Sequence, residues 1–409
     1  MKHQYLLSTL IQHPIRIAPL LLSVALLSGC ATTESRTAAD AASAGLAPDS
    51  SFDRNSASPE TAETSSSSAG ETERGSYPKI RMDADENGTQ KVTAKFEFEG
   101  QQVSFTLRVS EALLQGARNA YKFAVAKAGE GDADWRERYN MAFITDPAQE
   151  SFLNELHGTL VDIAKKQKLD DDRTVELFIS FVQYIKYDEQ DDAEARFPVE
   201  TFADQEGDCD DKSRLLVSLL SRSGYGTATL NFNDENHMAV GIKADAMEYR
   251  GTGYAYVETT SPSMVGFPFS DRANVQLHTT PVVQKIGKGK KKYKAAKTIL
   301  FLVDTKKKLE TEIEKAQKEI DKIAAQAQSA EAVVKKRESE LNRAQSGAAQ
   351  QRAVDKYNKA VDDYNALIER QKKAARAVNQ KIEVRNYIAT HANDRYNTYT
   401  WVKKQLRQQ

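Results

Sequence analysis

Apolar and polar residues alternate with a period of two in two separate parts of the chain, and this pattern predicts β-strands. In residues 79–109 the alternation runs on both sides of Glu99-Gly100, which predicts a hairpin with one buried face. Beyond Gly224 the same pattern predicts three further strands, at residues 225–232, 237–243 and 254–260.

Between these two parts, apolar residues recur at spacings of three and four, which predicts helices. Ser110 is a candidate N-cap of a helix that runs to about Lys127. Another helix follows the turn at Gly207-Asp208 and ends near Gly224, because glycine favours a C-terminal stop. Helices followed by an antiparallel sheet predict an α+β fold for residues 78–285. Two more helices are predicted at residues 147–168 and 172–186.

From Leu302 the apolar spacing becomes a heptad repeat that is interrupted once, at Ser346-Gly347. The two seams predict an antiparallel helical hairpin or coiled coil over residues 302–392, formed within one chain or as part of a multimer. Many seam positions of the first arm are alanine, so we expect this arm to need its partner arm or a partner protein. A basic linker, 286–301, precedes the hairpin, and an aromatic C-terminal tail, 393–409, follows it.

The first 29 residues have the pattern of a signal peptide for export. Their apolar run, 17–27, is too short for a comfortable membrane span, and it ends in Leu-Ser-Gly-Cys30, which resembles the bacterial lipobox. This resemblance implies cleavage before Cys30 and lipid on that residue. Because Ala31 follows, it also implies an outer-membrane lipoprotein of a Gram-negative bacterium, facing the periplasm. Residues 30–77 are rich in Ser, Thr, Ala, Gly and Glu, which predicts a disordered tether.

Composition argues against several classes of function. The chain has 57 Lys and Arg against 58 Asp and Glu, so its charge gives no reason to expect a polyanionic partner. Tyr293 is the one aromatic residue among the seven lysines of 285–297, so we expect no nucleic acid; contact with anionic lipid is an alternative to a solvated linker. No phosphate-binding glycine-rich loop is present, and the acidic cluster at 188–194 lacks EF-hand spacing, so no cofactor and no metal are expected.

The chain has two cysteines, and lipid on Cys30 would leave Cys209 as the sole thiol, without a disulfide partner. A lone thiol in an oxidising compartment is either buried or used. The predicted helix start at Cys209 would favour the thiolate, which is the form that attacks carbonyl carbons. Asp208, Asp210 and Asp211 act against this by raising the thiol pKa, unless they cap the helix or pair with neighbouring Lys212 or Arg214.

A thiol nucleophile needs a base and a group that orients the base. His237 is the best-placed histidine, because it opens a strand next to the helix that Cys209 begins. Glu258 lies on the following strand and is a candidate for orienting the imidazole. The backbone N–H of Cys209, with Gln183 or Gln205, is a candidate donor to an oxyanion, and the sequence does not choose between the two glutamines.

Several motifs occur in an order that resembles the bacterial and archaeal transglutaminase-like superfamily. They cover roughly residues 80–285 and include Phe197-Pro-Val-Glu-Thr-Phe, Gly207-Asp-Cys-Asp-Asp-Lys-Ser, His237-Met-Ala-Val-Gly and Tyr256-Val-Glu-Thr-Thr. The resemblance implies a papain-like core in which Cys209 is the nucleophile, His237 the base and Glu258 the residue at a position usually filled by Asp.

Two hypotheses about function follow from this resemblance. The first is a cysteine peptidase or amide acyltransferase that acts on protein or peptide amides through a thioester on Cys209. Water resolves that thioester in a peptidase, and an amine resolves it in a transamidase. The second is a non-catalytic scaffold or adaptor lipoprotein, in which the domain binds peptide and the coiled coil binds a partner protein of the cell envelope.

Overall fold

The computed structural model describes residues 76–82, 85–125, 129, 131–188, 194–267 and 277–408. The predicted signal peptide, Cys30 and nearly all of the predicted tether lie outside these residues, as do residues 189–193 of the acidic cluster. The chain forms two compact units. Of the described residues, the large unit contains those up to Lys318 and those from Val378 onwards, and the helical unit contains Glu319–Ala377. The large unit combines helices with small sheets, which confirms the predicted α+β class.

Five α-helices precede the candidate nucleophile in the described part of the chain. They are α1 Glu111–Arg118, α2 Asp132–Ile144, α3 Glu150–Lys166, α4 Asp171–Gln183 and α5 Pro198–Asp204. Ser110 caps α1 as predicted, but α1 ends well before Lys127. The sequence pattern missed α2, because its apolar residues are spread around the helix instead of lining one face. It also missed α5, which is too short to show a helical period.

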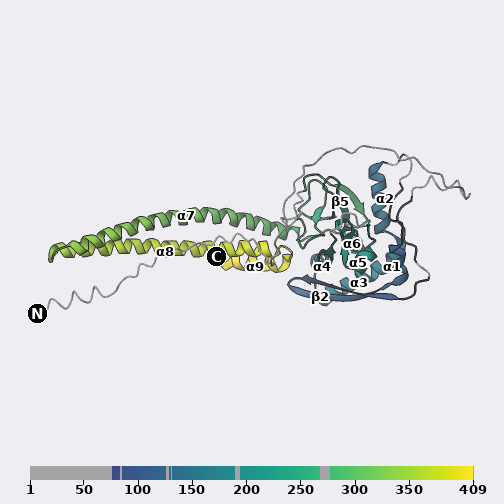
Figure 1. The fold of residues 1–409 in the computed structure, drawn as a ribbon, viewed down its shortest axis with the longest axis horizontal. Coiled ribbons are helices and arrows are strands. Elements are labelled where there is room, and N and C mark those ends of the chain that lie inside the picture. Colours follow the sequence, from purple (N-terminus) through teal and green to yellow (C-terminus); the bar gives the residue numbers. More distant parts are fainter. Residues whose placement is uncertain are drawn as a thin grey trace, which may run out of the picture. The chain divides into compact units, whose positions relative to one another are not determined.

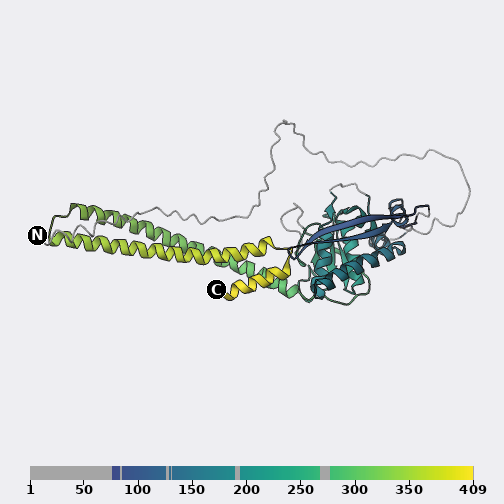
Figure 2. The ribbon, with the colours of Figure 1, turned by 90° about the horizontal axis from the view of Figure 1, so that it is seen from below.

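The predicted hairpin consists of β1 (Thr89–Phe98) and β2 (Gln101–Ser110), which pair antiparallel on either side of Glu99 and Gly100. Alternate residues are buried on one face, as the pattern predicted. The hairpin contacts α3, α4 and α5, and Figures 1 and 2 show it (dark blue) lying along these helices.

Helix α6 (Cys209–Arg222) lies at the centre of the large unit and begins where the sequence predicted a helix start. The strands after it are β5 Thr227–Phe232, β6 His237–Ile242, β7 Ala255–Val257 and β8 Val282–Ile286. They form one antiparallel sheet in the order β7-β6-β5-β8, which packs on one side of α6 (Figure 1). Helices α2, α3, α4 and α5 contact α6 as well. Three of these strands were predicted, and β8 adds an edge strand to them.

The basic linker and the aromatic tail both take part in the large unit. Tyr293 is buried, and its hydroxyl donates to Glu176 of α4. Helix α7 (Ala296–Arg343) begins inside the predicted linker. Helix α9 (Arg395–Gln408) is formed by the tail, and the Arg395 guanidinium pairs with the same Glu176. The unit therefore extends beyond the predicted core boundary.

Helices α7 and α8 (Ala348–Thr390) supply the helical unit, where they pair antiparallel. Val334 of α7 packs against Val361 of α8, and Glu319 pairs with Arg370 at 2.9 Å. The two helices are separated at the predicted break, so they pair within one chain. None of the described helices combines the length and the apolar composition that crossing a bilayer requires.

Candidate functional site

The candidate nucleophile, Cys209, is the first residue of α6. Asp208 is the N-cap of this helix, and its Oδ1 accepts a hydrogen bond from the Asp211 backbone N–H at 2.8 Å. The Cys209 backbone N–H occupies the first helical position, for which a helix provides no internal acceptor. This N–H is therefore a candidate donor to an oxyanion.

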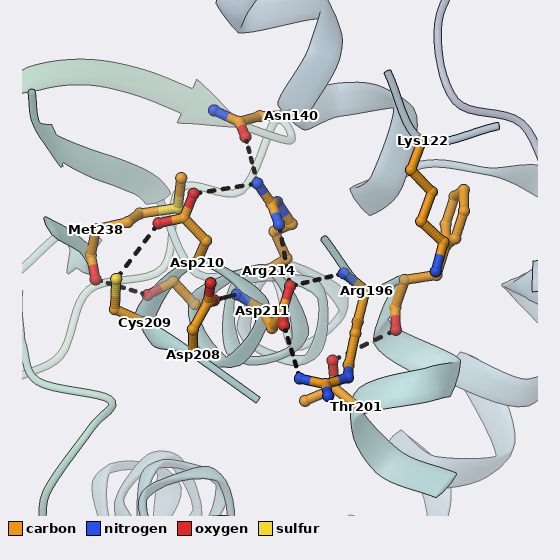
Figure 3. A network of polar contacts seen from close by, with 12 residues as sticks. Lys122, Asn140, Arg196, Thr201, Asp208, Cys209, Asp210, Asp211, Arg214 and Met238 are labelled. Atoms are coloured by element: carbon orange, nitrogen blue, oxygen red, sulfur yellow. Dashed lines mark hydrogen bonds and ion pairs between the residues drawn. The ribbon is translucent and has the colours of Figure 1, made fainter. Parts of the chain in front are cut away.

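The aspartates that follow Cys209 pair with arginines (Figure 3). Asp211 is buried, and it accepts from the Arg196 backbone N–H at 2.8 Å and from the Arg214 guanidinium at 3.2 Å. Asp210 pairs with the same guanidinium at 3.2 Å. These contacts compensate part of the negative charge that the sequence places around the thiol.

Lys212, which the sequence offered as a partner for these aspartates, binds elsewhere. Its buried ammonium donates to the carbonyl oxygens of Gln183 at 3.2 Å and Ile185 at 2.7 Å, at the end of α4. A cation there satisfies carbonyl groups that a helix end leaves unpaired. Burial lowers the pKa of Lys212 to about 8, and the negative charge of Glu258 opposes this shift. Lys212 thus joins α6 to the end of α4.

The Cys209 thiol is protonated at rest. Burial raises its pKa, and the charges of Asp210 and Asp208 raise it further, whereas the Met238 backbone N–H lowers it. The thiol donates to Asp210 Oδ1 at 3.5 Å. The sequence predicted that the helix terminus would favour a thiolate. Burial and the carboxylates outweigh that effect, since a helix terminus contributes at most about 2 kcal/mol even where the group is partly buried.

His237 and Glu258 lie close together, with the Tyr256 hydroxyl between them. The Tyr256 oxygen is 3.0 Å from His237 Nε2 and 2.7 Å from Glu258 Oε2, while the direct Nε2–Oε2 distance is 3.9 Å. All three side chains are buried. Glu258 Oε1 also accepts the backbone N–H groups of Thr259 at 2.9 Å and Thr260 at 2.8 Å. The predicted base and carboxylate therefore share one hydrogen-bonded chain.

This chain of hydrogen bonds fixes where each proton lies. The Tyr256 hydroxyl donates its one hydrogen to Glu258 Oε2, so its oxygen accepts from His237, and this places a proton on Nε2. Burial and then the charge of Glu258 raise the Tyr256 pKa well above its usual range, so the phenol keeps its proton. Burial lowers the pKa of His237, and Glu258 opposes this. A neutral imidazole protonated at Nε2 has Nδ1 as its basic nitrogen.

Strand β6 brings His237 towards the nucleophile. Ser213 Oγ of α6 lies 3.2 Å from the Met238 carbonyl oxygen, and the Met238 backbone N–H interacts with the Cys209 sulfur. The peptide group that follows His237 thus contacts the thiol. A cavity of about 640 Å³ opens beside this point, and its walls include His237, Met238, Asp210, Trp135 and Tyr139.

The two glutamines proposed as oxyanion donors have other partners. The Gln183 amide donates to the carbonyl oxygens of Glu258 at 2.9 Å and Ser263 at 3.0 Å, which uses both of its hydrogens. Gln183 therefore holds the loop after β7 and does not offer a donor to the thiol site. Gln205 ends α5 with a φ of 52°, and its amide donates to the Phe202 carbonyl at 2.6 Å, which leaves one hydrogen for another acceptor.

Two tyrosines belong to the site although the sequence gave them no role. Tyr256 lies in β7, two residues before Glu258, and this spacing was the one signal for it. Tyr187 lies in β3 (Lys186–Tyr187), which pairs with β4 (Glu206–Gly207) just before α6. Burial raises the pKa of Tyr187 to about 12, and the pairing with Gly207 places this residue beside the turn that leads to Cys209.

Among the described residues, one group of side chains is close enough to hold a metal ion. It consists of Asp208, Cys209 and Asp210, whose ligand atoms lie within 4.8 Å of one another. Asp208 already accepts from the α6 backbone, and Asp210 already accepts from the thiol and from Arg214. Hydrogen bonds thus account for this arrangement.

No family model matches this chain, and no curated protein or solved structure is significantly similar to it. The resemblance to transglutaminase-like proteins therefore rests on the motifs of the chain, and the site rests on its own geometry.

Proposed function

We propose that this protein is a transglutaminase-like cysteine peptidase or amide acyltransferase with Cys209 as its nucleophile. The observation that carries the proposal is the hydrogen-bonded chain from Glu258 through Tyr256 to His237 Nε2. His237 is followed in β6 by Met238, whose backbone N–H interacts with the Cys209 sulfur. A papain-like core is part of the proposal. It is supported by a central helix that begins at the thiol and packs on an antiparallel sheet, with the base at the start of β6 and the carboxylate directly after β7.

In the proposed reaction, His237 Nδ1 takes the thiol proton as the Cys209 sulfur bonds to the carbonyl carbon of an amide. The carbonyl electron pair moves to oxygen, where the Cys209 backbone N–H donates to it. The C–N bond then breaks, and the imidazolium gives its proton to the leaving amine. This step leaves a thioester on Cys209. Water or a second amine attacks the thioester, and the thiol is regenerated.

Two groups compete for the thiol proton in this proposal. Asp210 accepts the S–H in the resting structure, but a carboxylate is ordinarily a weaker base than an imidazole, by about two to three pKa units. Asp210 is also paired with Arg214 at 3.2 Å. The S–H must therefore turn from Asp210 to His237 for the reaction to begin.

The proposed setting follows from the N-terminal motif. Lipid on Cys30 would anchor the chain to the outer membrane with the folded units facing the periplasm, and the substrate would be a protein or peptide amide of that compartment. The helical unit would serve as the contact for an envelope partner.

The second candidate is a non-catalytic scaffold. It is favoured by one observation, the buried thiol with a raised pKa that donates to a carboxylate. On this alternative, Cys209→Ala leaves the cellular phenotype intact, whereas deletion of residues 302–392 abolishes it. A phenotype lost with Cys209→Ala alone excludes the scaffold.

The test of the enzyme proposal uses the full chain with Cys30→Ala, so that Cys209 is the one thiol. An iodoacetamide probe at neutral pH should label it, and adding His237→Ala should slow labelling by at least about 100-fold, as loss of a general base does. His278→Ala is the matched control, because His278 is exposed in a loop. A Cys209 that stays unlabelled in the folded wild type contradicts the proposal.

A further inference from the structure

Residues 121–125 form a short segment with its apolar side chains turned outwards. Tyr121, Phe123 and Val125 are 65%, 60% and 54% exposed, and the two aromatic ring centres lie 5.4 Å apart. Lys122, which lies between Tyr121 and Phe123 in the sequence, is buried and pairs with buried Glu200 at 2.7 Å. A charged residue inside and aromatic residues outside is the reverse of the usual arrangement.

The reversed arrangement is held in place from several directions. The Tyr139 hydroxyl of α2 donates to the Lys122 carbonyl oxygen at 3.0 Å, and the Val125 backbone N–H donates to the Ser76 carbonyl oxygen at 2.8 Å. A shift of one residue would bury the rings and expose the lysine. The fold instead maintains a buried ion pair and an exposed aromatic pair, both of which are unfavourable without a compensating contact.

The N-terminal part of the chain enters the large unit beside this segment. Ser76 is the first described residue, and it pairs with Val125. Exposed Lys79 and Arg81 follow it, and Met82, which is 54% exposed, packs with its Cα against Gly116 of α1. The segment that carries Cys30 therefore begins at the edge of the exposed apolar side chains. We call Tyr121, Phe123 and Val125 the aromatic face.

We propose that the aromatic face rests on the membrane to which the chain is anchored. Tyrosine and phenylalanine beside lysine and arginine suit the boundary between acyl chains and anionic headgroups. The tether that carries Cys30 joins the large unit at Ser76, beside this face. The proposal rests on the expected lipidation of Cys30 and is independent of the chemistry at Cys209.

The test places a tryptophan in the aromatic face of the full lipidated chain. Phe123→Trp protein is reconstituted in vesicles of phosphatidylethanolamine and phosphatidylglycerol, with or without brominated acyl chains that quench tryptophan. Val282→Trp is the matched control, because Val282 is 51% exposed and lies in β8 of the same unit. Quenching of Phe123→Trp well above that of Val282→Trp is expected, after subtraction of the wild-type signal. Equal quenching overturns the proposal.

A second measurement identifies other occupants. With Cys30→Ala, the pair Tyr121→Ser/Phe123→Ser should bind these vesicles at least about tenfold more weakly than the pair Val282→Ser/Val283→Ser, since two large apolar side chains no longer leave water. Equal binding by the two pairs counts against the membrane. If the Cys30→Ala protein is a dimer and the Tyr121→Ser/Phe123→Ser variant is a monomer, the face binds a second copy of the chain, and the proposal is also overturned.

Discussion

Helix α6 and the helical unit hold their charged residues in opposite environments. In α6, Asp211, Lys212 and Arg214 are 1%, 0% and 2% exposed, and each is bound by other parts of the large unit. In the helical unit, charges pair across exposed surface, as Glu319 and Arg370 do. A buried charge that loses its partner is costly, whereas an exposed pair contributes little. The charges of α6 therefore fix the geometry of the site, and those of the helical unit mainly keep it soluble.

Breaking the α6 network should have the largest effect. Arg214→Met leaves Asp211 buried with one cation fewer, and the free energy of unfolding should fall by about 3–5 kcal/mol. Urea unfolding of the full chain measures the loss. Since the single variant can fail to fold, the pair Asp211→Asn/Arg214→Met is its companion and should recover part of the stability. An Arg214→Met protein as stable as the wild type would contradict the importance of this pair.

The next effect concerns the pH dependence of stability. The folded pKa of Lys212 is about 8 and its ordinary value is 10.5, so between these values the unfolded chain binds more protons. Stability contributed by this group therefore rises with pH through that window, by on the order of 2–3 kcal/mol. The difference in unfolding free energy between wild type and Lys212→Met, measured from pH 7 to 10.5, should move in favour of the wild type. A difference that stays flat would mean that the ammonium is not perturbed by burial.

The smallest effect is expected in the helical unit. Glu319→Ala removes an exposed partner of Arg370, and the free energy of unfolding should change by less than about 1 kcal/mol. Urea unfolding of the same full chain allows direct comparison with Arg214→Met. A loss as large as the one predicted for Arg214→Met would remove the distinction between the two regions.

Local patterns predicted the elements that have a clear period. The β1–β2 hairpin, the start of α6, the strand that His237 opens and the break between α7 and α8 all follow from spacing alone. Helix α2 could not be found in this way, because its apolar residues do not segregate to one face. The same helix supplies Trp135 and Tyr139 to the cavity, so the shape of the cavity was hidden with it.

Long-range partners set the rest of the site. The hydrogen bond from the Arg196 backbone N–H to Asp211 depends on how the chain runs just before α5, which no local pattern indicates. The sequence offered Gln183 as an oxyanion donor, but its amide is used by the loop after β7, which no local pattern indicates. Tyr256 was quoted within a motif without a role, and its place between imidazole and carboxylate depends on the exact rotation of neighbouring side chains.

The central claim is that Tyr256 passes the orienting effect of Glu258 to His237, so that Nδ1 can take the thiol proton. The rate at which iodoacetamide alkylates Cys209 in the Cys30→Ala chain, with and without Tyr256→Phe, tests it most directly. The account predicts a rate that is about 10–100-fold lower in Tyr256→Phe, with a similar urea midpoint and a shifted pH profile, as for other supporting groups. Equal rates and equal pH profiles in the two proteins would contradict it.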